Sequence, residues 1–234
     1  MTDSAPKYHL EQIYNPEHAH PDEAHSVLMR LIPEKSRVLE LGCASGYLSG
    51  YMEKMLGCTV TGLEADSTAV AIAQTRCKEV HHVDLDMLDA LKIAESGAPY
   101  DVLLAAAVLE HLKYPENLLK QAHTLLAPNA IVIVSLPNIA YWAFRLKHLA
   151  GKFDYVDYGV MDRTHLHLYT VKTGRELLES AGYRVEKLFT AGSLFQNIAN
   201  AAARKLHRNP PPAIMPNLSA YELIFIARPK ITTH

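Results

Sequence analysis

The feature that most constrains the fold of this chain is a regular alternation of two sequence patterns. Short apolar runs rich in β-branched residues alternate with longer stretches whose apolar residues recur at helical spacing. The apolar runs cover residues 37–41, 59–63, 100–105 and 130–136, with a further run that ends at Val83. Such alternation is typical of βαβ units, in which parallel strands form a sheet with helices on both faces.

The last third of the chain departs from this alternation. Residues 182–189 and 221–227 again look like strands, but an Ala-rich helical stretch and the proline-rich segment NPPPAIMPN separate them. A proline-rich connection before an apolar strand indicates a closing, hairpin-like edge and not another βαβ unit. The sequence therefore predicts an α/β fold with a seven-stranded, mainly parallel sheet and an antiparallel last strand.

Length, charge and cysteine usage narrow the class of protein. A chain of 234 residues suits a single domain, 1–234, and its net charge of -2 gives no general attraction to nucleic acid. The three cysteines form no CxxC pair, which indicates a reducing compartment. No secretory signal opens the chain, and no apolar run approaches the ~20 residues that cross a bilayer. We expect a cytoplasmic protein with no nucleic-acid partner and no stable membrane insertion.

Several residues mark the expected ends of helices. Helical spacing runs from residue 47 to residue 55, and Asp66 or Ser67 can cap a helix that continues to residue 77. Pro115 suits a first helical turn, and the amphipathic stretch behind it extends to residue 126.

The segment VLELGCASGY, residues 38–47, combines a buried strand, a tight glycine turn and a helix start. Gly42 and Gly46 allow a sharp turn and a close approach of the backbone to a ligand. The N-terminus of the following helix presents unpaired N–H groups, which suit a carboxylate or phosphate. A purely structural strand–turn–helix has the same pattern.

Two acidic positions follow at the ends of the next strands. Glu64 ends the second strand, where a carboxylate can accept both hydroxyls of a ribose. Asp84 follows the third strand, where it can accept a hydrogen bond from an adenine amino group, and Asp86 competes for that role. Either aspartate could instead cap a helix.

These elements, in this order, resemble the class I S-adenosylmethionine (SAM)-dependent methyltransferase family over roughly residues 14–228. The resemblance implies a Rossmann-like fold and SAM as the cofactor. The sequence departs from the family's glycine motif at Ala44, which replaces the middle glycine. The fingerprint of a dinucleotide-binding site requires glycine at the positions that Ala44 and Tyr47 occupy here, so such a site is disfavoured. The cofactor contacts implied by the resemblance are Tyr14, Glu40, Gly42, Cys43, Ala44, Gly46, Glu64, Asp84, Leu85, Ala105 and Ala106.

A hydroxyl or amine acceptor would need a base, and histidine has a suitable pKa. Of thirteen histidines, His111 lies just after the strand that ends at the cofactor, and His165 lies in MDRTHLHLYT. We assign both as catalytic candidates, although His111 could equally be a packing residue. The histidines lack the spacing of a closed metal site, so no metal is expected.

The connection from Pro137 to Thr170 is rich in aromatic residues. One interpretation is an amphipathic helix over residues 139–149 that buries Trp142 and Leu146 on the sheet. A second is an acceptor lid, and a third is docking to a membrane surface. In the second interpretation the acceptor contacts are Tyr141, Trp142, Arg163, His165 and His167.

The block YGVMDRTHLHLYT is similar to ubiquinone-type O-methyltransferases and to MetW-like proteins. In that subgroup an N-terminal piece, here residues 1–35, forms a helical cap over the cofactor, which makes Tyr14 and His25 candidates for the cofactor cleft. The resemblance implies methyl transfer from SAM to oxygen, or else nitrogen, of a small-molecule or carrier-linked acceptor. A non-catalytic MetW-like partner protein and an enzyme that modifies protein or RNA are the alternatives. A homodimer is left open.

Overall fold

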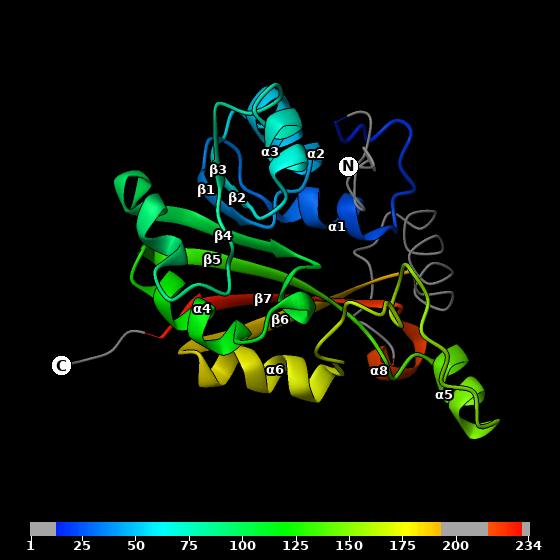
Figure 1. Cartoon of the computed structure of the whole chain (residues 1–234). Helices are drawn as coiled ribbons and strands as arrows, with labels where there is room; N and C mark the ends of the chain where they lie inside the picture. Colours follow the sequence, from blue (N-terminus) through cyan, green and yellow to red (C-terminus); the bar gives the residue numbers. More distant parts are fainter. Residues whose placement is uncertain (1–12, 193–214, 231–234) are drawn as a thin grey trace, which may run out of the picture.

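The computed structural model describes residues 13–192 and 215–230, and its centre is one seven-stranded sheet in the order β3-β2-β1-β4-β5-β7-β6 (Figure 1). The strands are β1 Arg37–Leu41, β2 Thr59–Glu64, β3 Glu79–His82, β4 Tyr100–Ala106, β5 Leu126–Pro137, β6 Tyr183–Ala191 and β7 Glu222–Pro229. The α-helices are α1 Ala24–Leu31, α2 Tyr47–Met55, α3 Ser67–Ala73, α4 Pro115–His123, α5 Trp142–Leu149, α6 Val171–Ser180 and α8 Pro216–Ser219. The 3-10 helices η1 and η2 cover Ala90–Gly97 and Leu109–His111.

The strand directions confirm the expected sheet. β1 pairs in parallel with β2 and β4, and β4 pairs in parallel with β5. β7 is antiparallel to both of its neighbours, β5 and β6. The two last strands do form a hairpin-like edge, in which β6 is the outermost strand and β7 lies between β5 and β6. This interior position explains why residues 223–227 are all buried.

Helices cover both faces of the sheet, as the alternating pattern predicts. In Figure 1, α4 and α6 lie on one face, while α1, α2 and α3 lie on the other. Leu118 of α4 and Leu178 of α6 belong to the larger apolar core, and Leu28 of α1 and Met52 of α2 belong to the second. Among the described residues no helix is long and apolar enough to cross a membrane.

Two helix ends differ from the sequence-based expectation. α3 ends at Ala73 and α4 at His123, each a few residues early. β5 then begins at Leu126 and takes in Pro128, because its register against β4 shifts between Tyr100 and Val102. A bulge of this kind is where a strand accommodates proline. The cap at Asp66 is confirmed, since its side chain accepts from the backbone N–H groups of the first turn of α3.

The expectation that the 139–149 helix buries Trp142 and Leu146 is wrong. α5 has no buried residue, and these two side chains remain 40% and 57% exposed. The helix projects beyond the sheet next to α8 and so cannot pack on either core (Figure 1). Tyr141 and Phe144 anchor it instead, because both rings lie against Tyr221.

Candidate active site

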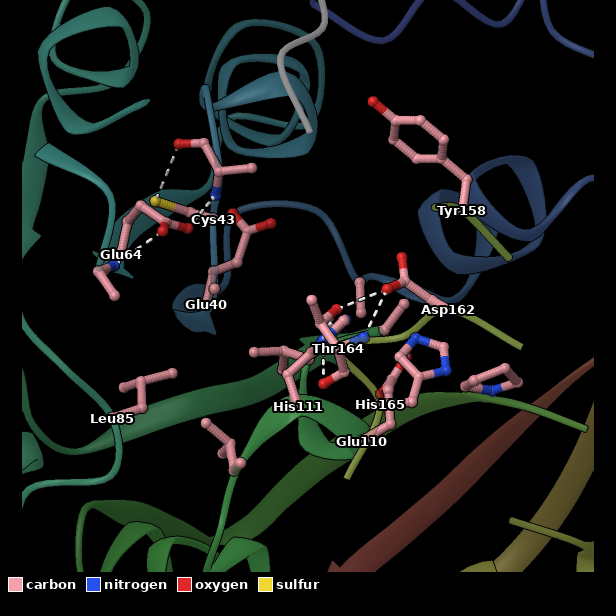
Figure 2. A pocket seen from close by; sticks show the side chains of 18 of the residues that line it. Glu40, Cys43, Glu64, Leu85, Glu110, His111, Tyr158, Asp162, Thr164 and His165 are labelled. Carbon is pink, nitrogen blue, oxygen red and sulfur yellow. Dashed lines mark hydrogen bonds and ion pairs between the residues drawn. The ribbon is translucent and has the colours of Figure 1, made fainter. Parts of the chain in front are cut away.

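A cavity of about 910 Å³ opens at the carboxyl ends of β1, β2 and β4. The sheet order reverses direction at the β1–β4 boundary, which is where open α/β sheets bind ligands. Figure 2 shows Glu64 and Cys43 at one end of this cavity and Glu110, His111 and His165 at the other. We call these the donor end and the acceptor end.

The glycine turn shapes the donor end. Gly42 has a φ of +68°, and a Cβ there would lie 2.6 Å from Val108 Cγ2. Only glycine therefore fits both the backbone conformation and the space. Gly46, with a φ of +72°, begins α2 and packs so closely on Cys77 and Ala73 that a Cβ would overlap them. Gly42 lines the cavity, whereas Gly46 serves the packing behind it.

The Glu64 carboxylate holds the turn in place. Its Oε2 accepts from the backbone N–H of Ala44, and its Oε1 accepts from those of Ala65 and Asp66, all at 2.8 Å. Ala44 adopts a φ of +46°, a conformation that the bond to Glu64 supports. A carboxylate has about four acceptor positions. Glu64 therefore keeps about one position, on Oε2, for a ligand hydroxyl.

Glu40 is a buried acid at the base of the donor end. Its side chain accepts a hydrogen bond from the Ser49 hydroxyl, and the residue lines the cavity. Burial raises the pKa of Glu40 to about 8, against the Ser49 hydrogen bond, and the nearby Glu64 adds to the rise. A cationic ligand group in the cavity would favour the ionised form of this carboxyl.

Asp84, Leu85 and Asp86 all line the cavity. Asp84 accepts from the backbone N–H of Asp86 at 2.9 Å. Asp86 accepts from the backbone N–H of Lys113 at 2.8 Å and so ties this loop to the connection between η2 and α4. Since Asp86 has this structural role, Asp84 remains our prediction for the ligand contact.

The acceptor end contains two histidines and two acids that come from separate parts of the chain. Glu110 and His111 lie in η2, directly after β4, while Asp162 and His165 lie in the connection from Pro137 to Thr170. Burial raises the pKa of Glu110 to about 8, and the charges of Glu222 and Asp162 add to the rise. His111 and His165, the two catalytic candidates from the sequence, both line this cavity, and their ring centroids lie 4.6 Å apart.

Several residues of this end were not among the predicted site residues. Those that line the cavity are Tyr158, Asp162, Thr164, Glu110, Tyr221 and Glu222. The available signal was Glu110, because an acid inside the apolar block VLEHL is unusual. Its burial, at 1% exposure, results from its place between β4 and the later connection.

Of four other residues predicted for the cofactor cleft, two lie away from the cavity and two line it. Tyr14 lies away from it: this residue packs on Tyr47 and Tyr51 and donates to Ser26. Ala105 is buried inside the sheet, although Ala106 does line the cavity. His25 also lines it, and burial lowers the pKa of that histidine.

The predicted acceptor contacts are divided in the same way. Of these, only His165 lines the cavity, while Tyr141, Trp142, Arg163 and His167 do not. Arg163 is exposed and pairs with Asp157 at 2.9 Å. The predicted N-terminal cap lies partly in residues 1–12, outside the described part of the chain.

Comparison with known proteins agrees with this geometry. A family model described as a methyltransferase domain matches residues 17–188, well over half of the chain. A ubiquinone biosynthesis O-methyltransferase of Caulobacter sp. (strain K31) is 32% identical over 123 residues, which are 51% of this chain and 48% of that protein. A pavine N-methyltransferase of Thalictrum flavum subsp. glaucum is 27% identical over 146 residues, 58% of this chain and 41% of that protein.

The chain thus spans about half the length of the curated relatives it matches. A SAM-dependent methyltransferase of Thermotoga maritima shares the fold with a TM-score of 0.61, at 17% identity, over 88% of this chain and 87% of that one. The glycine turn, the acid at the end of β2 and the family match together show that the chain belongs to the class I SAM-dependent methyltransferase family.

Proposed function

We propose that this chain transfers the methyl group of SAM to an oxygen of a small-molecule or carrier-linked acceptor. The observation that carries the proposal is one continuous cavity with a glycine turn and Glu64 at one end and Glu110, His111 and His165 at the other. A volume of about 910 Å³ is near the upper end of the roughly 300–1,000 Å³ of ligand pockets, which suits two ligands.

The donor end fits the parts of SAM. We assign the methionine portion to the turn at Gly42, with Glu40 below it, the ribose to Glu64 and the adenine to Asp84. SAM supplies a methyl group on a sulfonium, which leaves as a neutral thioether and needs little chemical help. The task of the protein is then to align the acceptor with that methyl group and to exclude water.

The acceptor end favours an atom that must lose a proton. Two histidines and a buried acid suit a hydroxyl, and the similarity to ubiquinone biosynthesis O-methyltransferases supports oxygen. The pavine N-methyltransferase similarity keeps nitrogen as the alternative acceptor atom. We further propose that residues 158–165, which supply this wall, are the functional part of the lid expected over residues 137–170.

Calorimetric titration with SAM and with S-adenosylhomocysteine, with NAD as a control, tests the donor assignment. We expect micromolar binding of the first two and none of NAD. Transfer of an isotope-labelled methyl group to a panel of phenols, alcohols and amines then tests the acceptor assignment. SAM binding without transfer to any acceptor would favour the partner-protein alternative, and no SAM binding would contradict the proposal.

A further inference from the structure

The acceptor end contains a cluster of side chains that could do more than accept a proton. Glu110, His111 and His165 each offer one ligand atom, and these atoms all lie within 4.8 Å of one another. Glu110 and His111 follow β4, and His165 comes from the connection more than fifty residues later. All three residues line the cavity. We call them the Glu–His–His cluster.

Glu110, one member of this cluster, has an oxygen without a hydrogen-bond partner in the described part of the chain. The residue is 1% exposed, and its Oε2 is buried without a hydrogen-bond partner among the described residues. Its Oε1 lies 4.0 Å from His165 Nε2, too far for a hydrogen bond. A buried carboxyl oxygen without a partner is costly, and a hydrogen-bond donor or a cation would remove that cost.

Backbone carbonyl groups orient the rings of His111 and His165. His165 Nδ1 lies 3.1 Å from the carbonyl of Val160, and His111 Nδ1 lies 3.3 Å from the carbonyl of Thr164. A carbonyl only accepts, so each contact needs a proton on Nδ1. The unprotonated nitrogen of each neutral ring is then Nε2, and that of His165 is the nitrogen nearest Glu110. Metal-binding histidines are held by such outer contacts.

The outer contact of His111 extends to an acid. Its Nδ1 also lies 3.0 Å from the Thr164 hydroxyl, which donates to Asp162 Oδ1 at 2.7 Å. Because the Thr164 hydrogen points to Asp162, its oxygen is an acceptor for His111. This chain fixes the ring and makes its other nitrogen a better ligand.

We propose that the Glu–His–His cluster is a binding site for a divalent transition-metal ion of the Zn²⁺ or Fe²⁺ type. Two imidazoles and one carboxylate are a ligand set for such ions, whereas Mg²⁺ and Ca²⁺ prefer oxygen alone. The ion would supply the missing partner of Glu110 and leave coordination positions toward the cavity. This inference replaces the sequence-based expectation that no metal is involved, which rested on the lack of a local motif.

The role of the ion rests on the proposed function. An acceptor hydroxyl bound to the ion would have a lowered pKa and would lie at a fixed place in front of the donor. The two rings would then be ligands, and the acceptor proton would leave from the ion-bound hydroxyl to solvent. The metal site itself does not depend on which acceptor is used.

The test is metal binding by the tag-free full chain after treatment with a chelator. Calorimetry with Zn²⁺, and the visible absorption of added Co²⁺, should show one strong site per chain. Glu110→Gln keeps the shape of the side chain and removes its charge, and His165→Ala removes a ligand; each should weaken Zn²⁺ binding at least about tenfold. His18→Ala removes an exposed histidine and should bind Zn²⁺ as the wild type does.

Thr164→Val keeps all three ligands and the backbone carbonyl near His111, and removes only the hydroxyl that links His111 to Asp162, so it should weaken Zn²⁺ binding by about 10- to 100-fold. It also answers the question if Glu110→Gln does not fold, which circular dichroism reports. No strong site in the wild type, or equal binding by Glu110→Gln, His165→Ala and His18→Ala, would overturn the inference. SAM titration of the same proteins separates the two proposals: SAM binding without a metal site contradicts this inference alone, and a metal site without SAM binding contradicts the proposed function alone.

Discussion

The two ends of the cavity are built in different ways. The donor end consists mainly of backbone: a glycine turn in which Glu64 accepts from the N–H of Ala44, with little choice of side chain at Gly42. The acceptor end consists of side chains, with Glu110 and His111 brought against His165 from a distant part of the chain. The donor end is therefore local in sequence, and the acceptor end exists only in the folded chain.

This difference predicts that members of the family share the donor end and differ at the acceptor end. A turn in which a Cβ has no room tolerates little variation. Side chains on a surface connection can vary without loss of the sheet. The following variants test whether the two ends are as separate as this comparison implies.

The largest effect is expected for Gly42→Ala. The new Cβ would overlap Val108 in a backbone conformation that disfavours alanine, and we expect a loss of about 2–4 kcal/mol in the free energy of unfolding. SAM binding should be lost with it. Gly57→Ala is the matched control, because φ is +65° there but the nearest atom is 3.7 Å away. Denaturant unfolding should show only about 1–2 kcal/mol for the control; equal losses would refute the role of the Val108 contact.

Glu64→Ala should weaken SAM binding by about 1–3 kcal/mol and also destabilise the ligand-free chain. The stability loss follows because three backbone N–H groups lose their acceptor. Glu34→Ala, an exposed acid, should change neither quantity. Calorimetry and denaturant unfolding measure the two effects, and unchanged SAM affinity in Glu64→Ala would remove the residue from the donor end.

Glu40 should make stability depend on pH. Its pKa is about 8 in the folded chain against an ordinary value of 4.5, so between these values the folded state holds a proton that the unfolded state has lost. Its contribution is present below pH 4.5 and is lost as the pH rises through 8. Glu40→Gln should therefore flatten the decline in unfolding free energy over that range. An unchanged slope would show that Glu40 is ionised when folded.

The smallest effect is expected for Leu146→Ala. The side chain is 57% exposed on α5, so the free energy of unfolding should change by less than about 0.5 kcal/mol. Leu118→Ala, in the core beneath α4, should cost about 2–5 kcal/mol. A large loss at Leu146 would show that α5 packs against another part of the chain, and would weaken the separation of the acceptor connection from the core.

Much of the fold follows from the sequence because burial on both faces leaves a continuous apolar run. β1 coincides with the run 37–41, and β7 differs from its run by only a few residues. The end of α4 and the start of β5 were harder to predict, since Pro128 looks like a helix stop and the bulge that accommodates this proline depends on pairing with β4. The order of β6 and β7 likewise depends on pairing between distant residues.

The donor end was predictable because its residues lie at the ends of strands that the sequence itself marks. Gly42, Glu64 and Asp84 each lie at or just after the carboxyl end of a strand, so strand prediction alone brings them to one edge. The acceptor end was predicted only in part. His111 and His165 stood out by residue type, but the apolar block around Glu110 was the only sign of its burial, and nothing in the sequence shows that Arg163 turns to Asp157.

The most direct test of the account is the SAM affinity of three proteins side by side: the wild type, Glu64→Ala and His165→Ala. Calorimetry should give a loss of about fivefold or more for Glu64→Ala and an affinity within about twofold of the wild type for His165→Ala. That result would establish a donor end that works without the acceptor end. Equal losses in the two variants, or none in either, would contradict the division of the cavity into two ends.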